Sequence, residues 1–261
     1  MARSHIVKIA DNFWNIRGSF RIGYLIDVGT HASLVRLGSG RFIMLDAYTL
    51  PAEAKAAVDA LTDDGAALEA IINLHPFHTV HVEGIHRLYP HAALYGTQRH
   101  HRLFPGLPWQ PLCSDDPALH RQFADDLSFS VPRGVDFISA NDNVHFASVL
   151  AFHRASRTVH VDDTFMYLQL PYAVNWLGLP GYVGLHPTLA FALEKRAGAA
   201  AELRQWVREL AADWAGAENL CAAHNGILQC RRQQGAPLGE RMLKALGHVE
   251  RILAAHENRY G

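Results

Sequence analysis

Short apolar runs, several of them alternating with polar residues, make up most of the first 50 positions. Alternation with a period of two places successive side chains on opposite faces, which is typical of a half-buried strand. Turn residues such as Gly38-Ser39-Gly40 separate the runs. The pattern predicts antiparallel strands over residues 6–9, 13–16, 23–27, 32–37 and 41–45.

Helical and strand patterns alternate after residue 50. Pro51 and good helix formers predict a helix over 52–61. The apolar run 68–74 predicts a buried strand, which is followed by a helical segment over 82–88 and a short strand over 92–95. Residues 96–120, rich in Pro, Gly and His, are expected to form a long loop. His100 and His101 are expected at the surface, although this pair is the first exception to consider because it lies in the loop.

The second half repeats this order in outline. Strand-like runs recur, residues 166–191 look irregular, and two amphipathic helices bracket a short strand. The expected strands cover 129–131, 136–139, 147–152, 158–161 and 220–223, and the expected helices cover 197–214 and 238–256. Two β-rich halves that meet near residue 130 and share one core are therefore expected. Because no linker composition separates them, we predict a single domain over residues 1–261.

Composition narrows the classes of function. The net charge is −1 and no basic block occurs, so a nucleic-acid partner is not expected. No apolar stretch approaches the ~20 residues that span a bilayer, and the N-terminus lacks a signal-peptide core. The three cysteines form no CxxC pattern, so disulfides are not expected. These features predict a cytoplasmic protein without a membrane partner, whereas its oligomeric state is left open.

Three histidines follow the predicted strand over 68–74 at intervals of three residues: His75, His78 and His81. Imidazole is a common metal ligand, and ligands that gather at a strand end form metal sites. Further ligand-type residues lie at the ends of, or entries to, other predicted strands: Asp46, His145, Asp163 and His224. We expect such positions to converge on one cleft.

Five segments, in this order and approximate spacing, resemble the motifs of the metallo-β-lactamase superfamily over most of the chain. They lie around Asp46, at His78-Thr-Val-His81-Val-Glu-Gly84, at His145-Phe-Ala-Ser, at Asp162-Asp163-Thr-Phe and at His224-Asn-Gly226. The resemblance implies an α+β fold, a four-layer αββα sandwich. It also implies a first metal site with His78, His145, Asp163 and a fourth ligand in His75, and a second with His81, His224 and the shared Asp163. Asp163 and His145 are the implied catalytic residues, and Asp46 is expected to support the histidine loop rather than to bind metal.

Two positions depart from the family motif. The first motif histidine falls on Pro76 and the motif aspartate falls on Val80, and neither side chain binds a metal. In the family this aspartate ligates the second metal or orients the attacking water. Its loss predicts a weaker second site.

The resemblance implies one or two divalent metals, zinc first, with iron or manganese as alternatives. A metal-bound hydroxide would attack an ester, amide, thioester or phosphoester in a small-molecule substrate. Two alternatives stand beside this metal-dependent hydrolase: a member of the superfamily that binds a ligand or partner without hydrolysis, and an iron-dependent redox member.

Overall fold

The computed structural model describes residues 5–19, 21–22, 26–27, 29–168, 181–223, 226–231 and 235–261. The chain divides into two compact units, each of which is described by itself. Unit 1 comprises Met1–Ser128 with His153–Ser156, and unit 2 comprises Phe129–Phe152 with Arg157–Gly261. The division falls close to residue 130, where the sequence predicts that the two halves meet, and the single domain stays a prediction.

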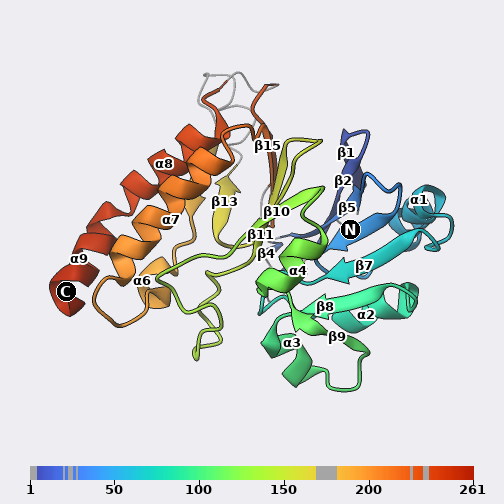
Figure 1. Ribbon diagram of the computed structural model, residues 1–261, viewed down its shortest axis with the longest axis horizontal. Coiled ribbons are helices and arrows are strands. Elements are labelled where there is room, and N and C mark those ends of the chain that lie inside the picture. Colours follow the sequence, from blue (N-terminus) through green and yellow to red (C-terminus); the bar gives the residue numbers. More distant parts are fainter. Residues whose placement is uncertain are drawn as a thin grey trace. The chain divides into compact units, whose positions relative to one another are not determined.

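Unit 1 is built on a seven-stranded sheet of order β1-β2-β5-β6-β7-β8-β9 (Figure 1). Neighbouring strands are antiparallel from β1 to β6 and parallel from β6 to β9. The strands are β1 (His5–Ala10), β2 (Phe13–Gly18), β5 (Thr30–Arg36), β6 (Phe42–Leu45), β7 (Leu68–Ile72), β8 (Ala93–Gly96) and β9 (Trp109–Cys113), and β3 (Arg21–Ile22) pairs separately with β4 (Ile26–Asp27). The helices are α1 (Ala52–Thr62), α2 (Val82–Leu88), α3 (Gln98–Leu103) and α4 (Pro117–Gln122).

The core of unit 1 lies between this sheet and its crossover helices. Val58 of α1 and Val82 and Ile85 of α2 are buried in the same cluster as Met44 and Ile71 of the sheet. Parallel strands need a crossover connection, and a helix with one apolar face buries that face on the sheet. The parallel edge therefore ends in a set of loops, one of which carries the histidine triplet between β7 and α2.

The expectation of a long loop over residues 96–120 is wrong, because α3, β9 and most of α4 lie within this range. Thr97 and His100 form a reciprocal capping box at the start of α3. Asp116 caps α4 by accepting a hydrogen bond from the backbone N–H of Ala118 at 2.7 Å, with Pro117 at the first helical position. The expected surface position of His100 is also wrong, since its side chain is fully buried and burial lowers its pKa to about 4.

Unit 2 carries a five-stranded sheet of order β10-β11-β12-β15-β16 and a separate β13–β14 hairpin. β12 and β15 are parallel, so both end at the same edge, and β16 returns antiparallel to β15. The strands are β10 (Leu127–Ser130), β11 (Leu150–His153), β12 (Thr158–Val161), β13 (Phe165–Leu168), β14 (Tyr182–Leu185), β15 (Asn219–Ala222) and β16 (Gly226–Gln229). The helices are α6 (Leu189–Ala192), α7 (Ala199–Asp213), α8 (Leu238–His248) and α9 (Glu250–Tyr260).

The core of unit 2 joins strand residues such as Val159 and Leu220 to Trp206 of α7, Met242 of α8 and Leu253 of α9. The single helix expected over 238–256 is instead two helices that meet at Val249. Two hydrogen bonds of the tighter i to i+3 kind occur there, from Val249 N to Leu246 O and from Ile252 N to Val249 O.

The strand expected over residues 136–139 is not formed, because only an isolated bridge joins Val135 to Leu193. The polar residues that follow make local turns, in which the Asn141 side chain accepts from the backbone N–H of Asn143 at 3.0 Å. Within the described ranges, no helix is long and apolar enough to cross a bilayer.

Candidate metal centre

The sequence-predicted ligands belong to both units. His75, His78 and His81 lie in unit 1, on the loop that joins β7 to α2, whereas His145 and Asp163 lie in unit 2. His224 lies outside the described residues. Convergence of all six side chains on one cleft stays a prediction, and the geometry is described within each unit.

His75 and His78 lie face to face in unit 1. Their ring centroids are 4.0 Å apart with planes inclined at 22°, and one ring nitrogen of each lies within 4.8 Å of the other. The backbone N–H of Phe77 donates to Nδ1 of the buried His75 at 3.1 Å. A neutral imidazole that accepts at Nδ1 carries its proton on Nε2. His75 must therefore lose this hydrogen bond before Nε2 can bind a metal, and its role as a ligand stays a prediction.

His81 is held in a different way. Its Nδ1 lies 3.1 Å from the hydroxyl of Thr49, and its ring meets the Tyr48 ring edge-on at a centroid distance of 5.0 Å. Nε2 is buried and has no hydrogen-bond partner among the described residues. Burial, and to a smaller extent the nearby His78, lowers the pKa of His81. When Nδ1 of such a ring donates to the Thr49 hydroxyl, the lone pair lies on Nε2, which is the form in which a histidine anchored through Nδ1 binds a metal.

Gly84 allows Thr49 to approach α2. A Cβ atom at position 84 would lie 2.0 Å from the Thr49 hydroxyl oxygen, which is closer than any side chain tolerates. The glycine of the His81-Val-Glu-Gly84 segment therefore has a local reason to be there. Any larger residue would displace the hydroxyl that orients His81.

Two buried polar residues, Asp46 and His100, support the loop that carries the three histidines. Asp46, in a left-handed conformation at φ 62°, accepts the backbone N–H of Leu74 on Oδ1 at 2.8 Å. His100 accepts from the backbone N–H of Thr97 on Nδ1, and its Nε2–H lies 3.4 Å from the carbonyl oxygen of His78. The supporting role expected for Asp46 agrees with this geometry. The role of His100 was missed, because a sequence does not show which histidine of a pair is buried.

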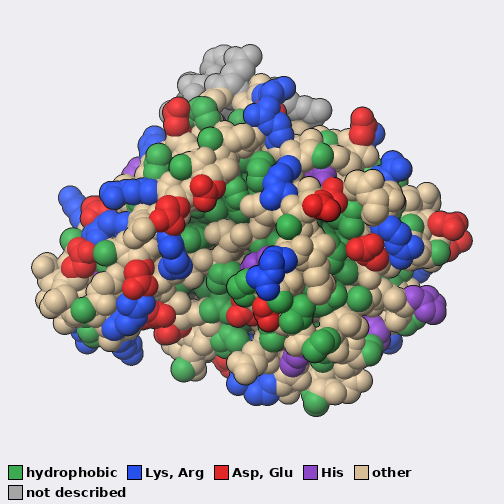
Figure 2. All heavy atoms as spheres, viewed as in Figure 1, with side chains coloured by type: hydrophobic (Ala, Val, Ile, Leu, Met, Phe, Trp, Pro, Cys, Tyr) green, Lys and Arg blue, Asp and Glu red, His purple; other side chains and the backbone are tan. Residues whose placement is uncertain are grey.

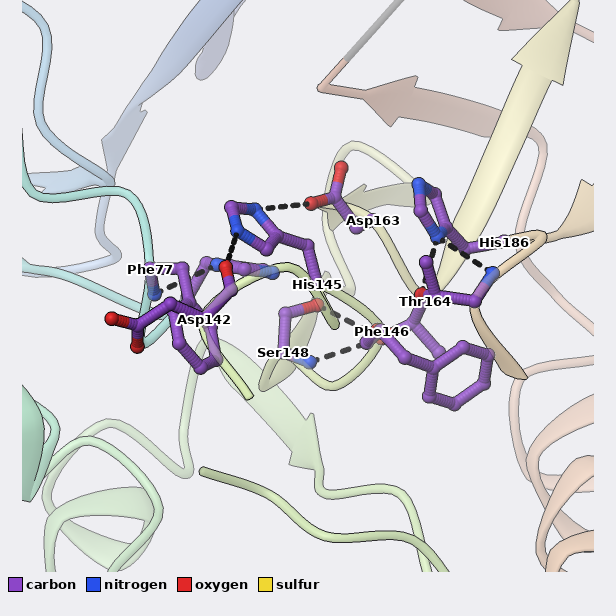
Figure 3. A network of polar contacts seen from close by, with 10 residues as sticks. Phe77, Asp142, His145, Phe146, Ser148, Asp163, Thr164 and His186 are labelled. Atoms are coloured by element: carbon purple, nitrogen blue, oxygen red, sulfur yellow. Dashed lines mark hydrogen bonds and ion pairs between the residues drawn. The ribbon is translucent and has the colours of Figure 1, made fainter. Parts of the chain in front are cut away.

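In unit 2, His145 and Asp163 face each other (Figure 3). Nε2–H of His145 donates to the carbonyl oxygen of Asp142 at 2.6 Å, which leaves the lone pair on Nδ1. That Nδ1 lies 4.0 Å from Oδ2 of the buried Asp163, too far for a hydrogen bond. The contact, drawn as a dashed line in Figure 3, is an ion pair when the ring is protonated and holds two ligand-type atoms near each other.

Thr164 joins the two segments that carry this pair (Figure 3). Its buried hydroxyl donates to the carbonyl oxygen of Phe146 at 2.9 Å and accepts the backbone N–H of Ser148 at 3.1 Å. The Ser148 hydroxyl lies 3.0 Å from the same oxygen. Since Thr164 follows Asp163 and Phe146 follows His145, this hydroxyl fixes the spacing of the two functional side chains.

A second pair of ligand types lies at the end of β12. A nitrogen of His160 and a carboxylate oxygen of Asp162 lie within 4.8 Å, and both residues are buried. Residues i and i+2 of a strand share a face, so the His-x-Asp spacing was the signal that identifies them. Asp163 follows Asp162 in the turn after β12.

Among the comparisons with known proteins, it is the comparison of structures that finds similar ones. No family model matches the sequence, and no curated protein matches it.

Solved metallo-β-lactamase structures are similar to it over nearly the whole chain. One is the enzyme of Erythrobacter litoralis with β-mercaptoethanol in the active site, at 14% identity and a TM-score of 0.61, covering 95% of this chain and 98% of that one. TMB-1 gives 12% identity and a TM-score of 0.62, with 96% and 100% covered. FIM-1 of Pseudomonas aeruginosa in the mono-zinc form gives 12% and 0.57, with 94% and 96% covered.

Proposed function

We propose that this chain, which has the α+β fold of the metallo-β-lactamases, is a metal-dependent hydrolase of small molecules. The fold itself is shown by the structural likeness and confirms the fold class expected from the motifs. The observation that carries the function is the state of the two anchored histidines. His81 and His145 are each anchored by a hydrogen bond at one ring nitrogen, to the Thr49 hydroxyl and to the Asp142 carbonyl oxygen, so the other nitrogen is the one that a metal would take.

This donor set fits a divalent metal. Neutral imidazole nitrogens and a buried carboxylate are ligands of zinc, and also of iron and manganese. The proposed ligands are His78, His145 and Asp163 with His75 at the first site, and His81, His224 and Asp163 at the second. Zinc is proposed first, since FIM-1 was solved in a mono-zinc form. When bound, such a metal supplies Lewis acidity and lowers the pKa of a water molecule to ~7.

The chain's own residues provide the rest of the mechanism. The Asp142 carbonyl oxygen requires the proton of His145 on Nε2, and the Thr49 hydroxyl anchors Nδ1 of His81, so both rings are oriented before a metal binds. Buried Asp163 brings a carboxylate, and Thr164 holds it beside His145. We propose an ester, amide, thioester or phosphoester substrate, and a cytoplasmic location.

Metal analysis combined with a substrate panel tests this proposal. Protein purified without added metal is expected to contain at least one zinc, iron or manganese ion per chain. It is expected to hydrolyse at least one of four chromogenic probes: an ester, a thioester, a β-lactam amide or a phosphodiester. A chelator should abolish this activity and zinc should restore it. Bound metal with no turnover of any probe would favour the non-hydrolytic binding protein, and reversible electron uptake by bound iron would favour the redox member.

Replacing Thr49 by valine is expected to weaken zinc binding by about tenfold, because the ring of His81 loses the hydroxyl that anchors its Nδ1. Thr49 is exposed, so stability should change little. Competition with a chromogenic chelator measures the affinity. Thr49→Ser keeps the hydroxyl and serves as the control. Equal affinity in the valine variant would show that His81 is not a ligand or needs no anchoring.

Val80→Asp is expected to raise the metal content toward two ions per chain and to increase turnover. The substitution restores the carboxylate of the family motif at a position whose side chain is 69% exposed, so it should fold normally. Val80→Asn is the matched control, because asparagine has the shape of aspartate but carries no charge. Metal-to-protein ratios by plasma emission spectrometry decide the matter. A ratio unchanged from the parent would mean that residue 80 does not face the second site.

A further inference from the structure

Unit 2 contains a pocket of 730 Å³ that none of the predicted metal ligands lines. Its walls come from three segments: residues 136–144, the residues around α6, and one face of α9. The volume lies in the range of small-molecule sites, ~300–1,000 Å³. The pocket is therefore a candidate binding site separate from the proposed metal centre.

Helix α9 forms one wall through two rows of residues. Arg251, Ala255 and Arg259 are four residues apart along the helix, and so are Ile252, His256 and Tyr260. Side chains at this spacing lie one above another on one face of a helix. The helix thus presents a cationic row beside a mainly apolar row, which is a surface suited to an amphipathic molecule.

The cations of the pocket are not neutralised by protein carboxylates. On the face drawn in Figure 2, basic and acidic side chains are interspersed, and elsewhere in unit 2 Arg204 pairs with Glu250. Within the described residues, by contrast, Lys195, Arg251 and Arg259 form no ion pair, and Arg259 lies over the Tyr260 ring at 5.3 Å. One acidic residue, Asp136, also lines the pocket, so the formal charge of its lining remains positive.

The apolar part of the pocket includes an aromatic ring that solvent reaches. Phe191 is 71% exposed, although most phenylalanine side chains are buried. Val144, Leu193 and Ile252 continue the apolar lining. An apolar ligand group would cover the ring and gain the free energy of removing that surface from water.

One buried polar atom in the pocket lacks a partner. His256 is only 8% exposed, and its Nε2–H donates to the carbonyl oxygen of Glu194 at 2.9 Å. Its Nδ1 is buried and has no hydrogen-bond partner among the described residues. Buried polar atoms are almost always satisfied, so this acceptor nitrogen suits a ligand that carries a hydrogen-bond donor beside its acidic group.

We propose that this pocket binds a small amphipathic anion, with its acidic group at Arg251, Arg259 and Lys195 and its apolar body against Phe191, Val144 and Ile252. Binding there does not require the metal centre. The lining segment 136–144 leads directly into His145.

Calorimetric titration of the intact, metal-free chain with octanoate tests the proposal without reference to hydrolysis. One octanoate is expected to bind per chain. Octanol, which lacks the charge, and octyltrimethylammonium, which reverses it, should bind at least about tenfold more weakly. Equal affinity for octanol would overturn the assignment of the cations.

Variants locate the binding. Arg251→Gln combined with Arg259→Gln should weaken octanoate binding by about tenfold or more, whereas the charge-matched pair Arg121→Gln and Arg208→Gln, both exposed and outside the pocket, should not. Ala255→Trp should block the pocket, and Ala254→Trp, exposed on the same helix but not lining it, should not. Unchanged binding in Ala255→Trp, or equal losses in both pairs, would overturn the proposal, and neither result bears on the hydrolase.

Discussion

Replacing Asp163 by alanine is expected to abolish metal retention and to reduce kcat/KM by roughly a thousandfold, about 4 kcal/mol of transition-state stabilisation. Asp163 is the one proposed ligand common to both sites, and its buried carboxylate faces Nδ1 of His145. Without it, neither set of histidines has a negative charge beside it to offset the positive charge of the metal. Metal content after dialysis and steady-state kinetics on the best probe substrate measure the two effects.

Two further variants separate loss of charge from loss of structure. Asp163→Asn keeps the size of the side chain and should lose metal and activity to a similar degree. Asp213→Ala removes an exposed carboxylate on α7 and should change neither. Full metal content in both Asp163 variants would show that the motif resemblance does not correspond to a working site.

Thr164→Val is expected to lower the free energy of unfolding by about 3 kcal/mol. Valine keeps the shape of the side chain but removes the hydroxyl, which leaves the buried backbone N–H of Ser148 and the carbonyl of Phe146 without this partner. Ser148→Ala removes only one hydroxyl contact and should cost about 1 kcal/mol. Urea denaturation followed by circular dichroism measures both values.

The same variant tests how His145 and Asp163 are positioned. If the Thr164 hydroxyl sets their spacing, Thr164→Val should also weaken zinc binding in protein that is still folded, while Ser148→Ala binds nearly as well as the parent. A fully folded Thr164→Val variant with unchanged stability and zinc affinity would contradict both roles.

Local patterns determined most elements of this protein. The strand over 158–161 and the helix over 82–88 agree with β12 and α2 residue for residue, because strong periodicity and clear turn residues bound them. The order of the motifs, rather than any single one, led to the correct fold. At 12–14% identity to the metallo-β-lactamases compared with it, that order is what the sequence retains of the fold.

The hydrophobic pattern failed to predict the structure where helix capping or a local helix break decided it. Residues 96–120 look like a loop by composition, yet Thr97 and Asp116 begin helices there by satisfying backbone N–H groups. The continuous pattern over 238–256 did not show the break at Val249 that divides it into α8 and α9. These helix starts and this helix break depend on a few hydrogen bonds, which the spacing of hydrophobic residues does not reveal.

The candidate site shows the same division. The sequence by itself supplied the ligand types and their positions at strand ends, since these follow from residue identity and element order. Only the tertiary structure decided that His100 is buried beneath His78, that Thr49 anchors His81 and that Thr164 holds Asp163 beside His145. The physical reason is that tautomer, burial and spacing depend on partners distant in the sequence, and these become neighbours only when the chain folds.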